Sequence, residues 1–118
     1  MKKLYLLQVI LFISLNFASA QYVNGFHIKD LPTNYIEIEL KKIPLTLKYK
    51  LKIDYGQKKD NRIVKTKDGK TMYFNSKIHA INFLTDMNYE YIDSYIENIE
   101  TRSYVYFILK NNNKKSTN

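Results

Sequence analysis

The sequence predicts an α+β protein in which an antiparallel sheet of about five to six strands carries one amphipathic helix on one face. Two observations lead to this class. Apolar and polar residues alternate at period two over much of residues 35–110, as in half-buried strands, whereas residues 77–87 alone have the period of a helix. The expected element order is β-β-β-β-α-β-β. A chain of 118 residues has the length of one domain, so a catalytic domain joined to a separate binding domain is excluded.

Residues 1–20 have the organisation of a secretory signal peptide. Lys2 and Lys3 precede an apolar stretch over residues 4–17, and the small residues Ala18-Ser19-Ala20 follow it. The alternative is an uncleaved N-terminal anchor, although a membrane-spanning helix needs about 20 apolar residues. We expect cleavage after Ala20, no stable membrane span in the remaining chain, and export to the periplasm, the cell surface or the medium.

Composition and charge narrow the classes of function. The chain has no cysteine, which excludes a disulfide framework, a thiolate metal site and a cysteine nucleophile. It has no Gly-x-Ser-x-Gly motif, and its three glycines do not form a glycine-rich phosphate loop. After residue 20 the chain has 17 basic and 11 acidic side chains, and residues 41–70 contain 11 of those basic groups but only 3 acidic ones. This concentration of charge points to an anionic partner.

The first predicted elements are strands. Residues 21–34 show no sustained period and are expected to form an irregular lead-in. Residues 35–40 alternate strictly, which predicts a half-buried strand. Pro44 has no amide donor and should interrupt the ladder, after which alternation resumes over residues 45–55 and predicts the strand with the cleanest period of the chain.

A hairpin and the helix follow. Asp68-Gly69 separates two β-prone runs, and such a pair favours a type I′ turn. Asn75 or Ser76 is expected to cap a helix that begins at about Lys77, and Asn88 is expected to end it in the left-handed region. The apolar face of this helix should consist of Ile78, Ala80, Ile81, Phe83, Leu84 and Met87.

The last predicted elements form a second hairpin. Residues 89–98 and 103–110 are rich in Tyr, Ile and Val, and a short polar segment joins them. Residues 104–109 are apolar on both faces, which predicts a central strand. Residues 111–118 are polar and basic and are expected to form a disordered tail. The single α+β domain should therefore span residues 35–110.

Five short motifs carry a family resemblance. They are the run Lys50-Leu51-Lys52-Ile53-Asp54-Tyr55-Gly56-Gln57, the Lys67-Asp68-Gly69-Lys70 turn, Phe74-Asn75-Ser76 at the helix start, Asn88-Tyr89-Glu90-Tyr91 after the helix, and the closing Tyr106-Phe107-Ile108-Leu109-Lys110 strand. Together they resemble a group of small exported bacterial proteins of unknown function, over about residues 48–110. The helix and closing strand are also similar to short bacterial domains with Gly-Trp-Glu after the helix, where this chain has Asn88-Tyr89. The resemblance implies an α+β fold and no activity.

Residues with catalytic or metal-binding chemistry are few. The chain has two histidines. A metal site on the helix would need a second ligand three or four residues after His79, but those positions are Asn82 and Phe83 and not Asp or Glu. We therefore expect His79 to be a partly exposed helix residue. Paired carboxylates can hydrolyse glycosides, but the acidic residues Glu90, Asp93, Glu97 and Glu100 follow a strand or loop pattern and are expected to be solvated. We assign no catalytic residue, metal or cofactor.

Two surfaces are candidate binding sites. Lys48, Lys50 and Lys52 share one face of a predicted strand, and further cations follow at Lys58, Lys59 and Arg62, which suggests an anion-binding face. Alternatively these cations only solubilise the sheet, with glutamates of the preceding strand paired to them. The second surface is aromatic: Tyr89, Tyr91 and Tyr95 are expected to share one face, and Tyr104 and Tyr106 another. Core packing is the alternative role of these tyrosines.

The sequence thus favours a small exported module without catalytic activity that binds a protein or an anionic component of the cell envelope. Export argues against nucleic acid as the partner. The alternative is a small secreted hydrolase or enzyme inhibitor, and self-association through a tyrosine-rich strand face is a third possibility.

Processing of the N-terminus tests the expectation that the protein is exported. N-terminal sequencing of the protein recovered from the exported fraction should begin at Gln21, because signal peptidase cleaves after the small residues that precede it. A recovered chain that still begins at Met1 and stays with the membrane would instead support the anchor.

Overall fold

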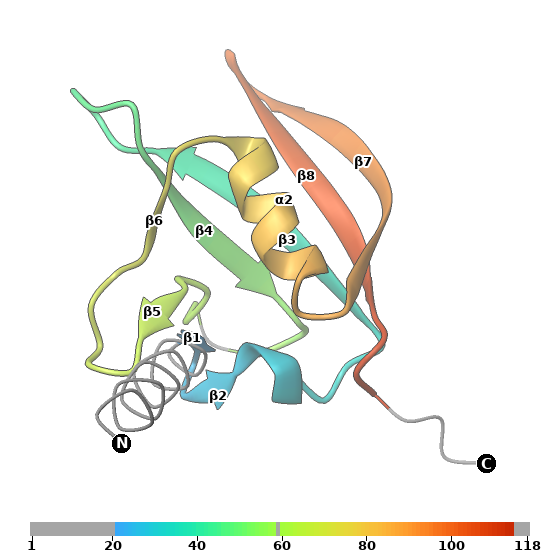
Figure 1. Cartoon of the computed structure of the whole chain (residues 1–118). Coiled ribbons are helices and arrows are strands. Elements are labelled where there is room, and N and C mark those ends of the chain that lie inside the picture. The colour runs from blue at the N-terminus through green and yellow to red at the C-terminus, as the bar shows by residue number, and fades with distance from the viewer. Residues whose placement is uncertain (1–20, 59, 115–118) are drawn as a thin grey trace, which may run out of the picture.

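A five-stranded antiparallel sheet, in the order β6-β4-β3-β8-β7, forms the centre of the fold (Figure 1). The computed structural model describes residues 21–58 and 60–114. The strands are β3 (Tyr35–Lys42), β4 (Tyr49–Asp54), β6 (Tyr73–Phe74), β7 (Tyr89–Ile99) and β8 (Arg102–Asn111). The helix α2 (Lys77–Thr85) connects β6 to β7 and lies across one face of the sheet. The predicted α+β class and the helix packed on an antiparallel sheet are confirmed.

The helix begins at Lys77 as its sequence predicts, ends at Thr85 before a turn that closes at Asn88, and buries a rotated face. The hydroxyl of Ser76 accepts a hydrogen bond from the backbone N–H of His79 at 3.0 Å, and Asn88 has φ of 66°. Ala80 and Leu84 are fully buried, whereas Ile78 is 63% exposed. Ile78 lies roughly 200° around the helix axis from Ala80, so the two side chains cannot face the same sheet. The prediction that Ile78 belongs to the core face was wrong.

A second, three-stranded sheet contains the first part of the predicted lead-in. Its order is β2-β1-β5, where the strands are β1 (Gln21–Val23), β2 (Phe26–His27) and β5 (Lys65–Thr66). A short 3-10 helix, η1 (Ile28–Asp30), follows β2. Residues 21–34 are therefore not irregular. Asn24 and Gly25 connect β1 to β2 with φ of 50° and 79°, the positive pair that a type I′ turn needs.

The Asp68-Gly69 turn differs from its predicted type. Only Gly69 has a positive φ, of 81°, and the N–H of Thr66 donates to the carbonyl of Lys70 at 2.8 Å across a three-residue loop. This pattern is typical of a turn that ends in a left-handed glycine rather than of a type I′ turn. The two arms then separate, because β5 pairs with β1 in the small sheet and β6 pairs with β4 in the large one.

The predicted strand over residues 45–55 is shorter in the structure. β4 begins at Tyr49, and the backbone N–H of Ile43 donates to the carbonyl of Lys48 at 2.9 Å to close the preceding loop. Pro44 cannot donate to a ladder, and Leu45 has φ of 62°, so the chain turns here despite its alternating sequence. Leu45 and Leu47 are consequently exposed.

The core lies between the large sheet, the helix and the N-terminal segment. Its fully buried side chains include Ile38, Leu51, Ile53, Phe74, Leu84 and Leu109. Below them, the hydroxyl of Tyr89 donates to the carbonyl of Ile28 at 2.6 Å. Within residues 21–58 and 60–114, no helix has the length and hydropathy of a membrane span.

The start of the predicted basic tail is also ordered. Asn111 is the last residue of β8 and is buried, and its side-chain amide donates to the carbonyls of Leu31 and Thr33 at 3.1 and 3.0 Å. The amide of Asn113 donates to the carbonyl of Met87 at 2.6 Å. The prediction of disorder was therefore wrong for residues 111–114, because asparagine amides satisfy buried carbonyls there. Residues 115–118 lie outside the described residues.

Asn111→Ala should lower the free energy of unfolding by about 1–3 kcal/mol, because two carbonyls would lose their donor in a buried site. Urea denaturation followed by circular dichroism measures this change. Asn112→Ala is the matched control, since the side chain of Asn112 is exposed. Equal stability of the two variants would contradict a structural role for the Asn111 amide.

Candidate functional site

One face of the five-stranded sheet is turned away from the helix. Alternate residues of β3 and β4 pack toward the helix, as the full burial of Ile38 and Ile53 shows, so their neighbours point to the other side. The register of the sheet extends this side across all five strands. We call it the open face, and by this register its residues include Tyr35, Glu37, Glu39, Lys41, Lys50, Lys52, Asp54, Tyr73, Glu90, Asp93, Tyr95, Glu97, Ile99, Arg102, Tyr104, Tyr106, Ile108 and Lys110.

A β-bulge decides which tyrosines reach the open face. Tyr91 lies opposite Leu109, but Asp93 lies opposite Ile108, so Ile92 is one extra residue in β7. One extra residue reverses the alternation of side chains that follows it. Tyr95 therefore joins the open face, while Tyr91 stays on the helix side and Tyr89 is buried. The prediction that Tyr89, Tyr91 and Tyr95 share a face was wrong.

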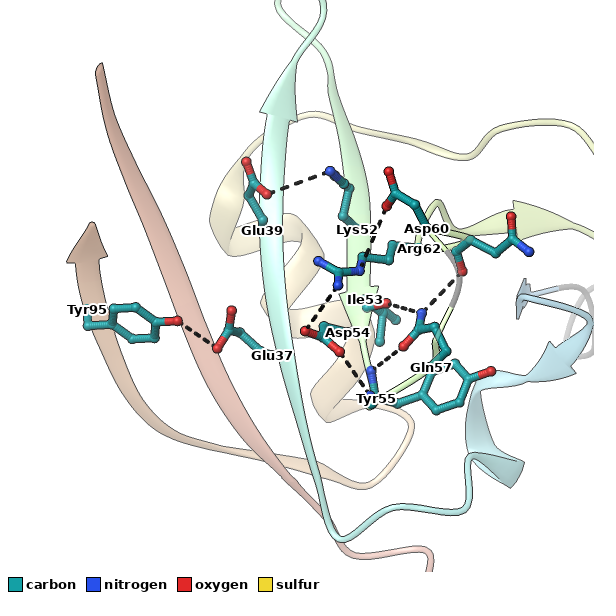
Figure 2. A network of polar contacts seen from close by, with 12 residues as sticks. Glu37, Glu39, Lys52, Ile53, Asp54, Tyr55, Gln57, Asp60, Arg62 and Tyr95 are labelled. Atoms are coloured by element: carbon teal, nitrogen blue, oxygen red, sulfur yellow. Dashed lines mark hydrogen bonds and ion pairs between the residues drawn. The ribbon is translucent and has the colours of Figure 1, made fainter. Parts of the chain in front are cut away.

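Tyr95 and Tyr106 form the aromatic part of the open face. Their rings stack with centroids 5.1 Å apart and an interplanar angle of 25°. The hydroxyl of Tyr95 donates to Oε2 of Glu37 at 2.7 Å (Figure 2). This hydrogen bond to a carboxylate raises the pKa of Tyr95 to about 12. Partial burial, reinforced by the charge of Glu39, also raises the pKa of Tyr106.

Two of the predicted anion-binding cations are paired with carboxylates. Nζ of Lys52 lies 3.9 Å from Oε2 of Glu39, and the guanidinium of Arg62 lies 3.6 Å from Asp54 and 3.8 Å from Asp60 (Figure 2). The glutamate pairing expected from the sequence is thus present at Glu39. Partly exposed pairs of this kind contribute only about 0–1 kcal/mol to stability, but they neutralise Lys52 and Arg62, two of the six predicted cations.

Gln57 shapes the loop that brings Arg62 beside β4. Its Oε1 accepts from the backbone N–H of Tyr55 at 2.8 Å, and its Nε2 donates to the carbonyls of Ile53 and Asn61 at 2.9 and 3.2 Å (Figure 2). The Gln57 side chain therefore connects the end of β4 to the segment that leads back to Arg62. Sequence reasoning missed this role, because an isolated glutamine in a polar loop has no distinguishing pattern.

Lys41 and Lys50 form a like-charged pair on the open face. They lie directly opposite each other in the β3–β4 register. Within residues 21–58 and 60–114, no carboxylate lies within ion-pair distance of either ammonium group. Like charges at such positions repel and destabilise the sheet. Lys41 was not among the predicted site residues, because only the register between the two strands reveals its neighbour.

A polar hollow of about 500 Å³ adjoins this pair, and we call it the basin. Three cations (Lys50, Arg62 and Lys65), the amides of Asn24 and Asn61, Thr71 and the carboxylate of Asp60 contribute to its lining. The two asparagines are hydrogen-bonded to each other at 3.1 Å. Ammonium, guanidinium, amide and hydroxyl donors together suit the oxygens of phosphate, sulfate or carboxylate groups.

The other predicted residues lie apart from the basin. Lys48 precedes β4 and lines a separate hollow with Leu47 and Tyr73, and Lys58 is exposed. Lys59 lies outside the described residues. His79 is exposed, as predicted, and its Nδ1 accepts from the backbone N–H of Asn75 at 3.1 Å. In the described part of the chain, no three His, Cys, Asp or Glu side chains are grouped so as to hold a metal ion.

No protein-family model matches the chain, and no match was found among curated proteins or solved structures. The resemblance of residues 48–110 to small exported bacterial proteins therefore stays a prediction. The chemistry of the open face and of the basin is what supports a function.

The raised pKa of Tyr95 gives a direct test of the open-face geometry. We expect the Tyr95 phenol to titrate at about 12, and Glu37→Gln to return it toward the ordinary value of about 10, because the hydrogen bond to the carboxylate favours the neutral phenol. Any stability that this bond contributes is present below pH 10 and is lost as the pH rises toward 12. Ring-carbon NMR of labelled tyrosines measures the titration, and Tyr95→Phe assigns the signal. An unchanged Tyr95 titration in Glu37→Gln would show that the bond is absent.

Proposed function

We propose that the protein is an exported, non-catalytic binding module that holds an anionic component of the cell envelope against the open face. Export is inferred from residues 1–20. The observation that carries the binding proposal is the Lys41–Lys50 pair, two neighbouring cations without a carboxylate partner in the described residues. An anionic group placed between them would replace a repulsion by two attractions, without any rearrangement of the sheet.

The distribution of the cations supports an extended polyanion as the ligand. Lys50 belongs both to the pair and to the basin, so the cationic surface continues from Lys41 on β3 to Lys65 on β5. Lys41 lies outside the basin, so these cations are spread over more than a single anion-sized site. A chain with repeated negative groups can contact several of them at once, whereas a single small anion would contact few.

A small secreted hydrolase or enzyme inhibitor is the alternative function. A hydrolase of this size would need carboxylates free to exchange protons with a substrate. On the open face, Glu37 accepts the Tyr95 hydroxyl, Glu39 faces Lys52, and Asp54 faces Arg62. These contacts favour structural roles for the three carboxylates and support the binding module.

Removal of the lysine pair tests the proposal. We expect Lys41→Ala/Lys50→Ala to weaken binding to vesicles that contain phosphatidylglycerol by roughly 30-fold, because each lysine at an anionic surface contributes about 1 kcal/mol. Vesicle co-sedimentation measures the affinity, and soluble polyphosphate is the second probe. Binding to either probe should also weaken as salt is added.

The matched control is Lys67→Ala/Lys70→Ala, which removes the same charge from the exposed Asp68-Gly69 turn. We expect this variant to bind far more tightly than the Lys41/Lys50 variant. Equal loss in both variants would mean that net charge alone causes binding, and retention in high salt would contradict an electrostatic site.

A further inference from the structure

The outer edge of β7 is unoccupied in the described chain. β7 is the last strand of the five-stranded sheet and pairs only with β8 on its inner side, as its place at the rim shows (Figure 1). Ten of its eleven residues are exposed. The edge of a strand carries backbone N–H and C=O groups that can pair with another strand. Natural proteins shorten such edges, cover them, or place bulges and charges on them. β7 is the longest strand here, and its bulge at Ile92 leaves residues 93–99 as a regular stretch.

The side chains of β7 have a consistent chemistry after the bulge. Asp93, Tyr95 and Glu97 point to the open face, and Ser94, Ile96 and Asn98 point to the helix side. Ile96 is 64% exposed. The strand has three carboxylates and no lysine or arginine, in a protein whose overall charge is positive.

We propose that residues 93–99 of β7 accept an extended segment of a partner protein, in which lysine or arginine alternates with apolar residues, as a sixth strand of the sheet. On the open face, basic residues spaced four apart would lie beside Asp93 and Glu97. On the other face, an apolar residue would cover Ile96. Backbone hydrogen bonds would supply affinity, and this alternation would supply specificity.

Charge complementarity selects this occupant over the others. A second copy of β7 would place three carboxylates against three, and like charges on adjacent strands repel. An anionic polymer, the ligand proposed for Lys41 and Lys50, is disfavoured here for the same reason. The bulge at Ile92 also interrupts the ladder, so the occupant should begin after it. This inference therefore concerns a different surface and a partner of opposite charge.

A peptide titration tests the inference on the full protein. The probe is a fluorescent synthetic peptide with the sequence of residues 47–53, in which lysine alternates with apolar residues and two lysines are spaced four apart. Anisotropy should show saturable binding, and hydrogen exchange measured by mass spectrometry should slow within residues 93–99. Asp93→Asn/Glu97→Gln should weaken the peptide affinity by roughly 2- to 30-fold, as expected for two lost cross-strand charge pairs.

Two controls separate strand addition from charge attraction. The same peptide with every backbone nitrogen methylated keeps its charge but has no N–H on either edge to donate to the ladder, so it should not bind. Asp68→Asn/Asp86→Asn removes two exposed carboxylates elsewhere and should leave the affinity unchanged. Binding of the methylated peptide, equal weakening in both variants, or no binding at all would overturn the inference. Self-association that protects β7 without peptide would show instead that a second copy occupies the edge.

Discussion

The fold depends on one constraint: α2, the one α-helix of the described residues, has nine residues and must shield a five-stranded sheet. A helix with its side chains is about 10–12 Å across, whereas five strands spaced about 4.8 Å apart span about 19 Å. The helix can therefore cover only part of one face. The N-terminal segment closes more of that side through Tyr89 and Asn111, which bond to carbonyls of residues 28–33. Residues 21–58 and 60–114 leave the opposite face and the outer edge of β7 uncovered.

The uncovered surfaces differ in charge. Near the centre of the open face, carboxylates pair with Lys52 and Arg62 and accept the Tyr95 hydroxyl, so this region is internally satisfied. Two sets of charged side chains outside these contacts lie at the two sides of the open face. Lys41 and Lys50 form a cationic pair on β3 and β4, whereas Asp93 and Glu97 form an acidic row on β7. Two separate surfaces of opposite sign on so small a domain suit a protein that contacts two kinds of partner.

Alternation in the sequence predicts the faces of β3 and β4 well, because each residue of those strands has one of two directions. The prediction of faces fails where an inserted residue or a turn interrupts the alternation of the backbone. The extra residue at Ile92 reverses the face of Tyr95, and Pro44 turns the chain although Leu45 and Leu47 continue the pattern. The hairpin at Asn24-Gly25 could have been predicted, because an Asn-Gly pair favours a type I′ turn. The Lys41–Lys50 pair could not be predicted from the sequence, because it depends on the register between β3 and β4.

Chemical-shift mapping tests whether Lys41, Lys50 and the basin beside them form a binding site. Amide spectra of the purified protein should be recorded during titration with soluble polyphosphate. We expect the largest shifts at Lys41, Lys50 and the basin residue Lys65, with little change at the Lys67–Lys70 turn, which also has two lysines. Shifts of equal size over all exposed lysines, or shifts confined to that turn, would contradict the claim.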